Sequence, residues 1–171
     1  METVMTELKR PDVSLLDKYT GVDFRPLYRT KVTVTGGEAR HGRASGIAKS
    51  SDGALNINLR LPRELGGPGG GTNPEQLLAA GYAACFHGAL NLVAARKRVA
   101  VGESAVNVSV TFGRDPADGL FLLTADVEVS LPGVEKQLAE DLIRETEQVC
   151  PYAKMMRQGA QSSVRLAQVS T

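Results

Sequence analysis

Hydrophobic residues along the chain follow two different periods, one typical of strands and one typical of helices. A period of two marks expected strands at 31–35, 55–60, 106–112 and 121–131, and the last of these is the most regular. The intervening stretch from Glu38 to Ser51 is charged and contains glycine, so we expect the strands on either side to be joined by a hairpin or a long loop. A final short strand is expected around Val164 and Leu166.

Two helices are predicted between and after these strands. The first follows the glycine run at 66–71, extends from Thr72 to about Val93, and is apolar on almost every side, which indicates burial. Thr72 and Glu75 have the spacing of a capping box at its start. Glycines inside this helix, at positions 81 and 88, lower its intrinsic stability, so we expect close packing against another backbone there. The second helix is amphipathic, starts near Val134 and ends at the Cys150–Pro151 pair.

The order of these elements predicts an α+β fold with antiparallel hairpins. One sheet can cover only one side of a helix that is apolar all round, so we expect a second subunit to cover the other side and the protein to be a homodimer. Residues 1–27 carry no sustained period and are predicted to form an N-terminal arm. Residues 28–171 are predicted to form a single domain, which suits a chain of 171 residues.

The charge balance of the chain narrows the range of partners. With 20 basic and 19 acidic residues the chain has a net charge of +1, so it offers no excess field for nucleic acid, and we expect no nucleic-acid partner. The first residues lack the pattern of a secretory signal, and no apolar stretch is expected to be long enough to span a bilayer. We therefore expect a cytoplasmic protein without a membrane partner.

Cys85 and Cys150 are the only thiols of the chain. Each has an ordinary structural explanation, because Cys85 lies in an apolar helix and Cys150 ends a helix before a proline. A redox role requires a cation near Cys85 to stabilise its thiolate, and a second thiol within reach. In a reducing cytoplasm any disulfide between the two is expected to be transient.

Other candidate residues have weaker support from spacing alone. Glu75 precedes Cys85 by ten residues, a rise of about 15 Å on a straight helix, so a joint role needs a bend near Gly81 or a substrate-sized gap. His87 is two positions from Cys85 and faces another side of the helix. A zinc site with His41 matches no closed metal knuckle, and the glycine run lacks the lysine and hydroxyl residue that end a phosphate loop. We expect no bound metal or cofactor.

Two segments carry a resemblance to a known family. The stretch from Pro62 to Leu90, with Thr-Asn-Pro-Glu-Gln-Leu at 72–77 and Ala-Ala-Cys-Phe at 83–86, resembles the organic hydroperoxide resistance (Ohr) branch of the OsmC-like thiol peroxidases. Ser-Asp-Gly at 51–53 and Val-Cys-Pro-Tyr at 149–152 extend the resemblance, which covers the chain from about Tyr28 to its end. It implies antiparallel sheets wrapped around a buried central helix, in an intertwined homodimer with active sites at the subunit interface.

The resemblance also implies roles for four residues. Cys85 would be the peroxidatic cysteine, which becomes a sulfenic acid, and Cys150 the resolving cysteine, which forms a disulfide with it. Glu75 would pair with an arginine beside the thiolate. The loop that should carry this arginine is longer than usual, so Arg43 and Arg40 compete, and we favour Arg43 because strand register fixes its reach. The substrate would be an organic hydroperoxide, and the external reductant a dihydrolipoyl group on a lipoylated protein.

Two alternatives from other classes remain open. The same fold can serve as a peroxide-sensing or binding module that reacts once without turnover and signals through the arm. A purely structural dimer with inert thiols is the third possibility. Sustained turnover with a dithiol reductant separates the enzyme from the sensor, and ordinary cysteine pKa values would favour the structural dimer.

Overall fold

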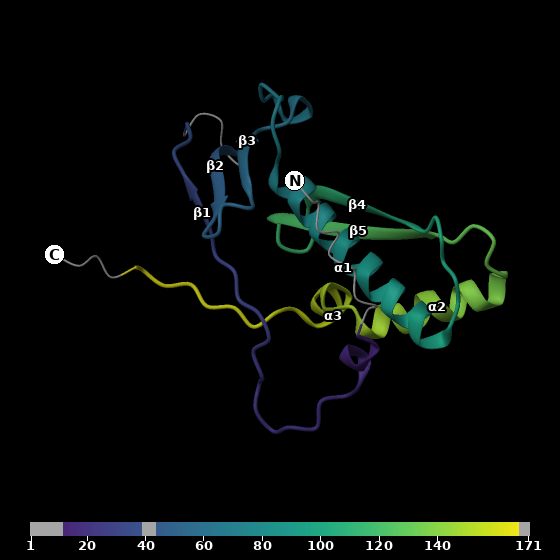
Figure 1. The fold of residues 1–171 in the computed structure, drawn as a ribbon. Coiled ribbons are helices and arrows are strands. Elements are labelled where there is room, and N and C mark those ends of the chain that lie inside the picture. The colour runs from purple at the N-terminus through teal and green to yellow at the C-terminus, as the bar shows by residue number, and fades with distance from the viewer. Residues whose placement is uncertain (1–11, 39–43, 168–171) are drawn as a thin grey trace, which may run out of the picture. The chain divides into compact units, whose positions relative to one another are not determined.

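A computed structural model describes residues 12–38 and 44–167, and its mixture of helices and antiparallel strands confirms the α+β prediction (Figure 1). The helices and strands are β1 (Val32–Thr35), β2 (Ser45–Ser50), β3 (Asn56–Arg60), α1 (Pro74–Lys97), β4 (Ala105–Arg114), β5 (Phe121–Ser130), α2 (Lys136–Val149) and α3 (Pro151–Gln158). Single turns of 3-10 helix occur at Val13–Leu16 and Arg63–Leu65.

The described residues fall into two compact units. The first, which we call the thiol unit, contains 12–16, 84–105 and 129–167. The second, the sheet unit, contains 17–38, 44–83 and 106–128. Helix α1 is continuous and contributes its first part to the sheet unit and its remainder to the thiol unit. The predicted division into an arm at 1–27 and a domain at 28–171 stays a prediction.

The sheet unit contains a three-stranded antiparallel sheet with the order β1-β2-β3. Strand β2 lies in the stretch that we expected to join two strands as a hairpin or a long loop, so that expectation is wrong. The six residues of β2 include a glycine at position 46 with φ of +94° and have no clear alternation, and their partners on both sides supply the pairing instead. A Cβ at Gly46 would lie 2.4 Å from the carbonyl oxygen of Thr35, so the two strands approach too closely there for a side chain.

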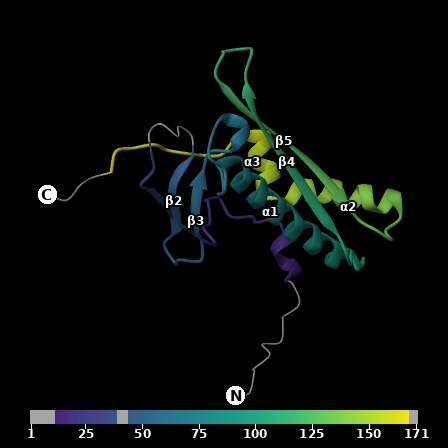
Figure 2. The same cartoon turned by 90° about the horizontal axis from the view of Figure 1, so that it is seen from above.

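Strands β4 and β5 form a long hairpin, as their period of two predicts (Figure 2). The rings of Phe112 and Phe121 pack at a centroid distance of 4.8 Å, and the guanidinium of Arg114 lies 4.0 Å from the centroid of the Phe121 ring. Apolar residues near the start of β5 are nevertheless exposed, among them Phe121 and Leu123. Part of the apolar face that the sequence predicts is therefore uncovered in the single chain.

Helix α1 begins one residue later than its expected cap implies. The Asn73 side chain accepts a hydrogen bond from the Gln76 backbone N–H at 2.9 Å, and the Gln76 side chain accepts one from the Asn73 N–H at 3.3 Å. This reciprocal pair is a capping box. The predicted box of Thr72 and Glu75 is therefore wrong, and the Glu75 carboxylate is not the one that closes it.

Burial along α1 is uneven within the single chain. The large side chains Tyr82, Phe86, Leu90 and Val93 are buried, whereas a stripe of small residues is exposed at every fourth position, comprising Ala80, Ala84 and Gly88. A Cβ at Gly88 would meet no described atom within 4 Å, so the close packing expected at this glycine is not found in the chain. The uncovered side of the helix is this small-residue stripe.

The expectation that no segment could span a bilayer is wrong on length and composition. Helix α1 has 24 residues, and its most apolar window of 18 residues has a mean hydropathy of 1.5. The buried Phe86, Leu90 and Val93 belong to a protein core, and a core helix can satisfy the same two criteria. Hydropathy therefore does not distinguish the two environments for this helix.

The thiol unit has its own core, built where α2 packs beside the later part of α1 (Figure 1). Leu90, Val93, Leu142 and Thr146 are almost completely buried. The Thr146 hydroxyl donates to the Leu142 carbonyl at 2.7 Å, which satisfies the polar group inside this core.

Charged side chains join the same two helices at the surface. Arg96 Nη2 lies 2.6 Å from Glu145 Oε1, and Lys97 Nζ lies 2.8 Å from Glu145 Oε2. These hydrogen bonds, from Lys97 first and then Arg96, lower the pKa of Glu145. The Glu145 carboxylate therefore stays ionised and ties the end of α1 to α2.

The C-terminal region differs from expectation in two ways. A helix, α3, follows Pro151 directly, although the sequence analysis predicted no helix there. The strand expected around Val164 and Leu166 is absent, since the described residues 159–167 have no regular structure and both side chains are exposed. Alternation at two positions is a weak signal, and pairing depends on a neighbouring strand that these residues lack within the described chain.

Candidate active site

The fold brings the two cysteines together inside the thiol unit. The Cys150 thiol donates a hydrogen bond to the sulfur of Cys85, with a distance of 3.7 Å between the two Sγ atoms. Cys150 has 0% of its surface exposed, and Cys85 is half-buried. The thiols are 65 positions apart in sequence, so their contact is a product of tertiary structure.

The position of Cys150 follows from the break between two helices. It caps the C-terminus of α2 and the N-terminus of α3, with φ of −70° and ψ of 118°. Its N–H donates to the Thr146 carbonyl at 2.9 Å, and its own carbonyl accepts from the Lys154 N–H at 3.0 Å. Cys150 is thus fixed by backbone bonds to both helices, and its side chain enters the core.

The surroundings of Cys85 act on its pKa in both directions. Burial raises the pKa of the Cys85 thiol most strongly, a hydrogen bond from the Tyr152 backbone N–H lowers it, and the Cys150 thiol raises it further, so the net direction is upward. No cation among the described residues contributes to this shift. A reactive thiolate at neutral pH therefore requires a positive group from elsewhere.

The remaining predicted site residues cannot be placed beside the thiols. Glu75 is half-buried in the first turn of α1 and belongs to the sheet unit. Arg43, Arg40 and His41 lie outside the described residues. The structure thus brings together Cys85 and Cys150. The catalytic roles of these two cysteines, of Glu75 and of the arginine stay predictions.

His87 makes its contacts away from the cysteine pair. Its Nε2 lies 3.3 Å from the Ser104 hydroxyl, and its backbone carbonyl accepts a hydrogen bond from Asn91 Nδ2 at 2.8 Å. That His87 does not form a nucleophile pair with Cys85 stays a prediction. Among residues 12–38 and 44–167, no group of three or more metal-ligating side chains could hold a metal ion.

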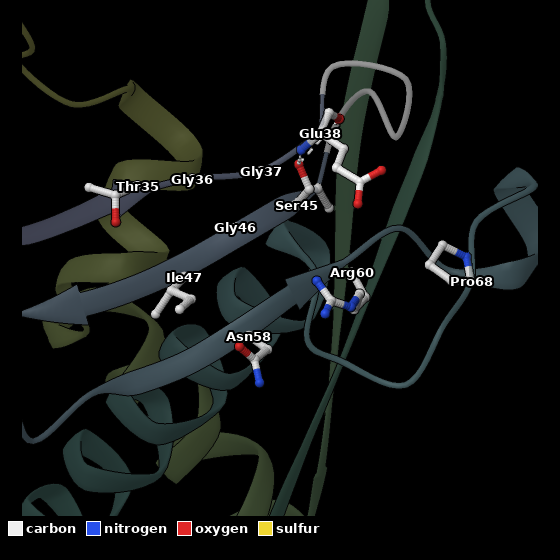
Figure 3. A pocket seen from close by; sticks show the side chains of 11 residues that line it. Thr35, Gly36, Gly37, Glu38, Ser45, Gly46, Ile47, Asn58, Arg60 and Pro68 are labelled. Atoms are coloured by element: carbon white, nitrogen blue, oxygen red, sulfur yellow. Dashed lines mark hydrogen bonds between the residues drawn. The ribbon is translucent and has the colours of Figure 1, made fainter.

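A cavity of about 550 Å³ opens in the sheet unit. Figure 3 shows Asn58 and Arg60 on β3, Ile47 on β2, and Pro68 on the glycine-rich loop. Arg60 Nη1 donates to the Leu59 carbonyl at 3.2 Å. The described lining of this cavity contains no thiol, so the cavity and the cysteine pair are separate features of the described residues.

The Tyr152 N–H is a site group that the sequence analysis missed. A backbone donor has no side-chain signature, so no motif names it. Proline at position 151 was the available signal, because it interrupts the helix and frees the next N–H from a helical hydrogen bond. Tyr152 lies in the first turn of α3, and its backbone hydrogen bond lowers the pKa of Cys85.

Comparisons with known proteins identify the family. A family model described as "OsmC-like protein" matches residues 67–165. The organic hydroperoxide resistance protein of Xanthomonas axonopodis pv. citri is 45% identical over 143 residues, which cover 82% of this chain and 95% of that protein. The chain belongs to the Ohr branch of the OsmC-like family. The organic hydroperoxide resistance protein OhrB of Bacillus subtilis is 36% identical over 77% of this chain and 91% of its own.

Solved structures of Ohr proteins share the fold. The crystal structure of OhrB of Bacillus subtilis has a TM-score of 0.67 and 36% identity, covering 78% of this chain and 93% of that chain. An organic hydroperoxide resistance protein from Legionella pneumophila has a TM-score of 0.70 and 37% identity, with coverage of 79% and 93%. The antiparallel sheets and central helix predicted for an OsmC-like fold are therefore confirmed, and the Ohr relatives support a role in organic hydroperoxide resistance.

Proposed function

We propose that this protein is a thiol-dependent peroxidase that reduces organic hydroperoxides to alcohols through Cys85 and Cys150. The observation that carries the proposal is the separation of 3.7 Å between the two sulfur atoms. A disulfide has an S–S distance of about 2.05 Å, so the sulfurs need to approach by about 1.6 Å to form one. A side-chain rotation or small backbone shift can supply that movement.

The reaction divides into three balanced steps. The Cys85 thiolate attacks the terminal oxygen of the hydroperoxide, the O–O bond breaks, and the alkoxide takes a proton and leaves as an alcohol. Cys85 is then a sulfenic acid. The Cys150 sulfur attacks it, forms the disulfide and releases water, which takes up the thiol proton. An external dithiol of the dihydrolipoyl type, carried by a lipoylated protein, gives two electrons and two protons and restores both thiols.

An arginine is needed to overcome the burial of Cys85. In this proposal Arg43, with Arg40 as the alternative, places its guanidinium beside the Cys85 sulfur, and Glu75 holds the guanidinium in position. A neighbouring positive charge lowers a thiol pKa, which opposes the upward shift caused by burial. The same guanidinium would polarise the peroxide.

The proposed assembly is a homodimer in the cytoplasm. The exposed small-residue stripe on α1 and the exposed Phe121 and Leu123 on β5 are apolar surfaces that a second copy of the chain could cover. The Ohr relatives support the family context of this proposal. No nucleic acid, metal or bound cofactor takes part in the proposed reaction.

The function is tested by following thiol loss after mixing the reduced protein with tert-butyl hydroperoxide or hydrogen peroxide. We expect faster oxidation by the organic hydroperoxide, and a Cys85→Ser variant should lose turnover by at least about a hundredfold because the nucleophile is absent. A Cys150→Ser variant should still form the sulfenic acid but no intramolecular disulfide. Full turnover by Cys85→Ser would refute the assignment.

The same assay separates the enzyme from the peroxide-sensing module. With a dihydrolipoyl reductant present, an enzyme consumes many equivalents of hydroperoxide for each protein chain. A sensor is oxidised once and stops. Consumption of a single equivalent would therefore replace the peroxidase proposal with the sensing alternative.

A further inference from the structure

The break between α2 and α3 leaves the Glu147 carbonyl without its helical partner. In a continuous α-helix the carbonyl of Glu147 would accept from the N–H four residues later. That residue is Pro151, which has no N–H. Arg157, on the last turn of α3, supplies the missing donor: its Nη1 lies 3.0 Å from the Glu147 carbonyl oxygen and 3.3 Å from Glu147 Oε1.

The same break frees a donor on the other side of the junction. In a continuous helix the Tyr152 N–H would bond to the Gln148 carbonyl. A backbone hydrogen bond from Tyr152 lowers the pKa of Cys85, so this N–H faces the thiol. Cys150 is the N-cap of α3. The start of this helix therefore carries the Tyr152 N–H, which faces the Cys85 thiol, and the Cys150 thiol, which contacts it. The position of α3 therefore sets the geometry of the pair.

Helix α3 is poorly held by its own packing. It has eight residues, and Ala153 is its one buried side chain. Helices this short are not stable on their own, so contacts with neighbours determine where α3 lies. Within the thiol unit the Arg157–Glu147 contact joins α3 back to α2, about two turns beyond the junction.

We propose that Arg157 is a positioning residue for the proposed peroxidase, which holds the start of α3 so that the Tyr152 N–H reaches Cys85 and the Cys150 sulfur stays within reach of it. Arg157 acts through the backbone of α2 and α3 and does not touch the reacting atoms. This inference rests on the proposed function for its catalytic consequence, whereas its geometric part concerns the thiols alone.

The carbonyl contact is the important half of this interaction. The side chains of Arg157 and Glu147 are 36% and 50% exposed, and an exposed ion pair contributes little. The carbonyl is fixed by the helix, and a guanidinium can bridge it and a second acceptor at once. Removing the Glu147 carboxylate should therefore matter much less than removing the guanidinium.

The first test measures Cys85 alone, without peroxide. In a Cys150→Ser background, the rate of Cys85 alkylation by iodoacetamide is followed against pH. Arg157→Gln should move the midpoint upward by about half a pH unit, the size expected when a helix N-terminus leaves a charge. Arg157→Lys should recover at least half of that shift, and Glu147→Gln should leave the midpoint unchanged because the carbonyl remains. Arg144→Gln is the matched control, since Arg144 is an exposed arginine on α2 that pairs with Asp141.

The second test measures resolution in the protein with both cysteines. After one equivalent of tert-butyl hydroperoxide, Arg157→Gln should form the disulfide about tenfold more slowly, because a small misplacement of reacting atoms slows a reaction strongly. Its sulfenic acid should then accumulate and be trapped by dimedone. Circular dichroism melting confirms that each variant is folded, and Arg157→Met, which keeps the apolar stem, replaces Arg157→Gln if that variant does not fold.

Each outcome decides one point. The inference would be overturned if Arg157→Gln had the same alkylation midpoint and the same rate of disulfide formation as Arg144→Gln. It would also be overturned if the alkylation midpoint of Arg157→Lys were shifted as far as that of Arg157→Gln. A wild-type protein that alkylates normally but does not consume hydroperoxide would refute the proposed function. In that case the alkylation midpoint alone still decides whether Arg157 positions α3.

Discussion

At Cys85, burial and a single backbone donor act in opposite directions on one sulfur. Burial raises the pKa of the thiol and the Tyr152 N–H lowers it, with burial the larger effect. The nucleophile of the proposed reaction is the thiolate, so a raised pKa reduces the reactive fraction at neutral pH. The thiolate fraction of Cys85 at neutral pH therefore depends on whether a guanidinium lies beside its sulfur.

The arginine requirement can be tested at the level of single residues. Replacing both Arg43 and Arg40 by glutamine should raise the Cys85 pKa by about one to three units, because an adjacent opposite charge shifts a pKa by that amount. At pH 7 the rate of oxidation by tert-butyl hydroperoxide should fall by at least about tenfold and should recover as the pH rises. Thiolate absorbance during pH titration measures the shift, and the two single variants show which arginine is responsible.

In the double variant the free energy of unfolding should fall as the pH rises, whereas the oxidation rate should increase. A thiol whose folded pKa is raised above its unfolded value holds its proton more tightly in the folded state. The free energy of unfolding should therefore decrease as the pH rises from the unfolded pKa through the folded one. An unchanged thiolate titration in the double variant would show that neither arginine serves Cys85.

The two cysteines could be selected from the sequence, but their contact could not. Each lies in a helical pattern, and nothing in the spacing places the start of α3 against the middle of α1. The resemblance to Ohr proteins supplied the pairing as an expectation, and the structure gives the distance of 3.7 Å. The Tyr152 donor is beyond sequence reasoning because every residue type except proline has the same backbone N–H at that position.

At the scale of elements, the start of α1 shows how a correct motif can be read one residue out of register. Thr72 with Glu75 and Asn73 with Gln76 both fit the capping-box spacing. The backbone settles on the second pair, with Pro74 at the start of the helix. This assignment leaves the Glu75 carboxylate outside the box, as the proposed pairing with an arginine requires.

The cap register predicts a difference in stability between neighbouring variants. Asn73→Ala should lower the free energy of unfolding by about 1 kcal/mol, because it removes the side chain that accepts from the Gln76 N–H. Thr72→Ala should change it by much less, since Thr72 takes part in the structure through its backbone N–H, which donates to Asn58. Urea unfolding measures both. A larger loss for Thr72→Ala would favour the box that the sequence first indicated.

Elements with a clear period were predicted well, and elements defined by their neighbours were not. The hairpin of β4 and β5 and helix α2 have long periodic patterns, and α1 is a long apolar stretch that follows a capping signal. Strand β2 is short and polar, with a glycine at position 46, and exists because β1 and β3 pair with it on both sides. Helix α3 follows a proline that the sequence analysis took as an end, although proline also suits the first turn of a new helix.

At the scale of the whole molecule, the single chain leaves several apolar surfaces uncovered. Val22 and Phe24 in the predicted arm are 98% and 92% exposed, and apolar residues of β5 are exposed as well. The small-residue stripe on α1 would let another backbone approach closely. These surfaces are the physical basis for expecting a second subunit.

Dimerisation is tested by sedimentation equilibrium. We expect a particle of twice the 18.2 kDa chain mass at micromolar concentration. Ala84→Arg should weaken association by at least about tenfold, because it places a long charged side chain on the small-residue stripe. Ala54→Arg, in an exposed turn of the sheet unit, is the matched control and should not change it. A wild-type protein that sediments as a monomer would contradict the expected dimer.

The unequal burial of the two sulfurs determines where electrons would return to the oxidised protein. Cys150 has no exposed surface, whereas Cys85 is partly open to solvent. Thiol–disulfide exchange needs the incoming sulfur to reach one end of the bond. In the proposed cycle an external dithiol would therefore attach first to Cys85, and Cys150 would depart as the leaving group. The Cys85 sulfur would thus be the atom that reacts with the hydroperoxide and also the atom that the reductant attacks.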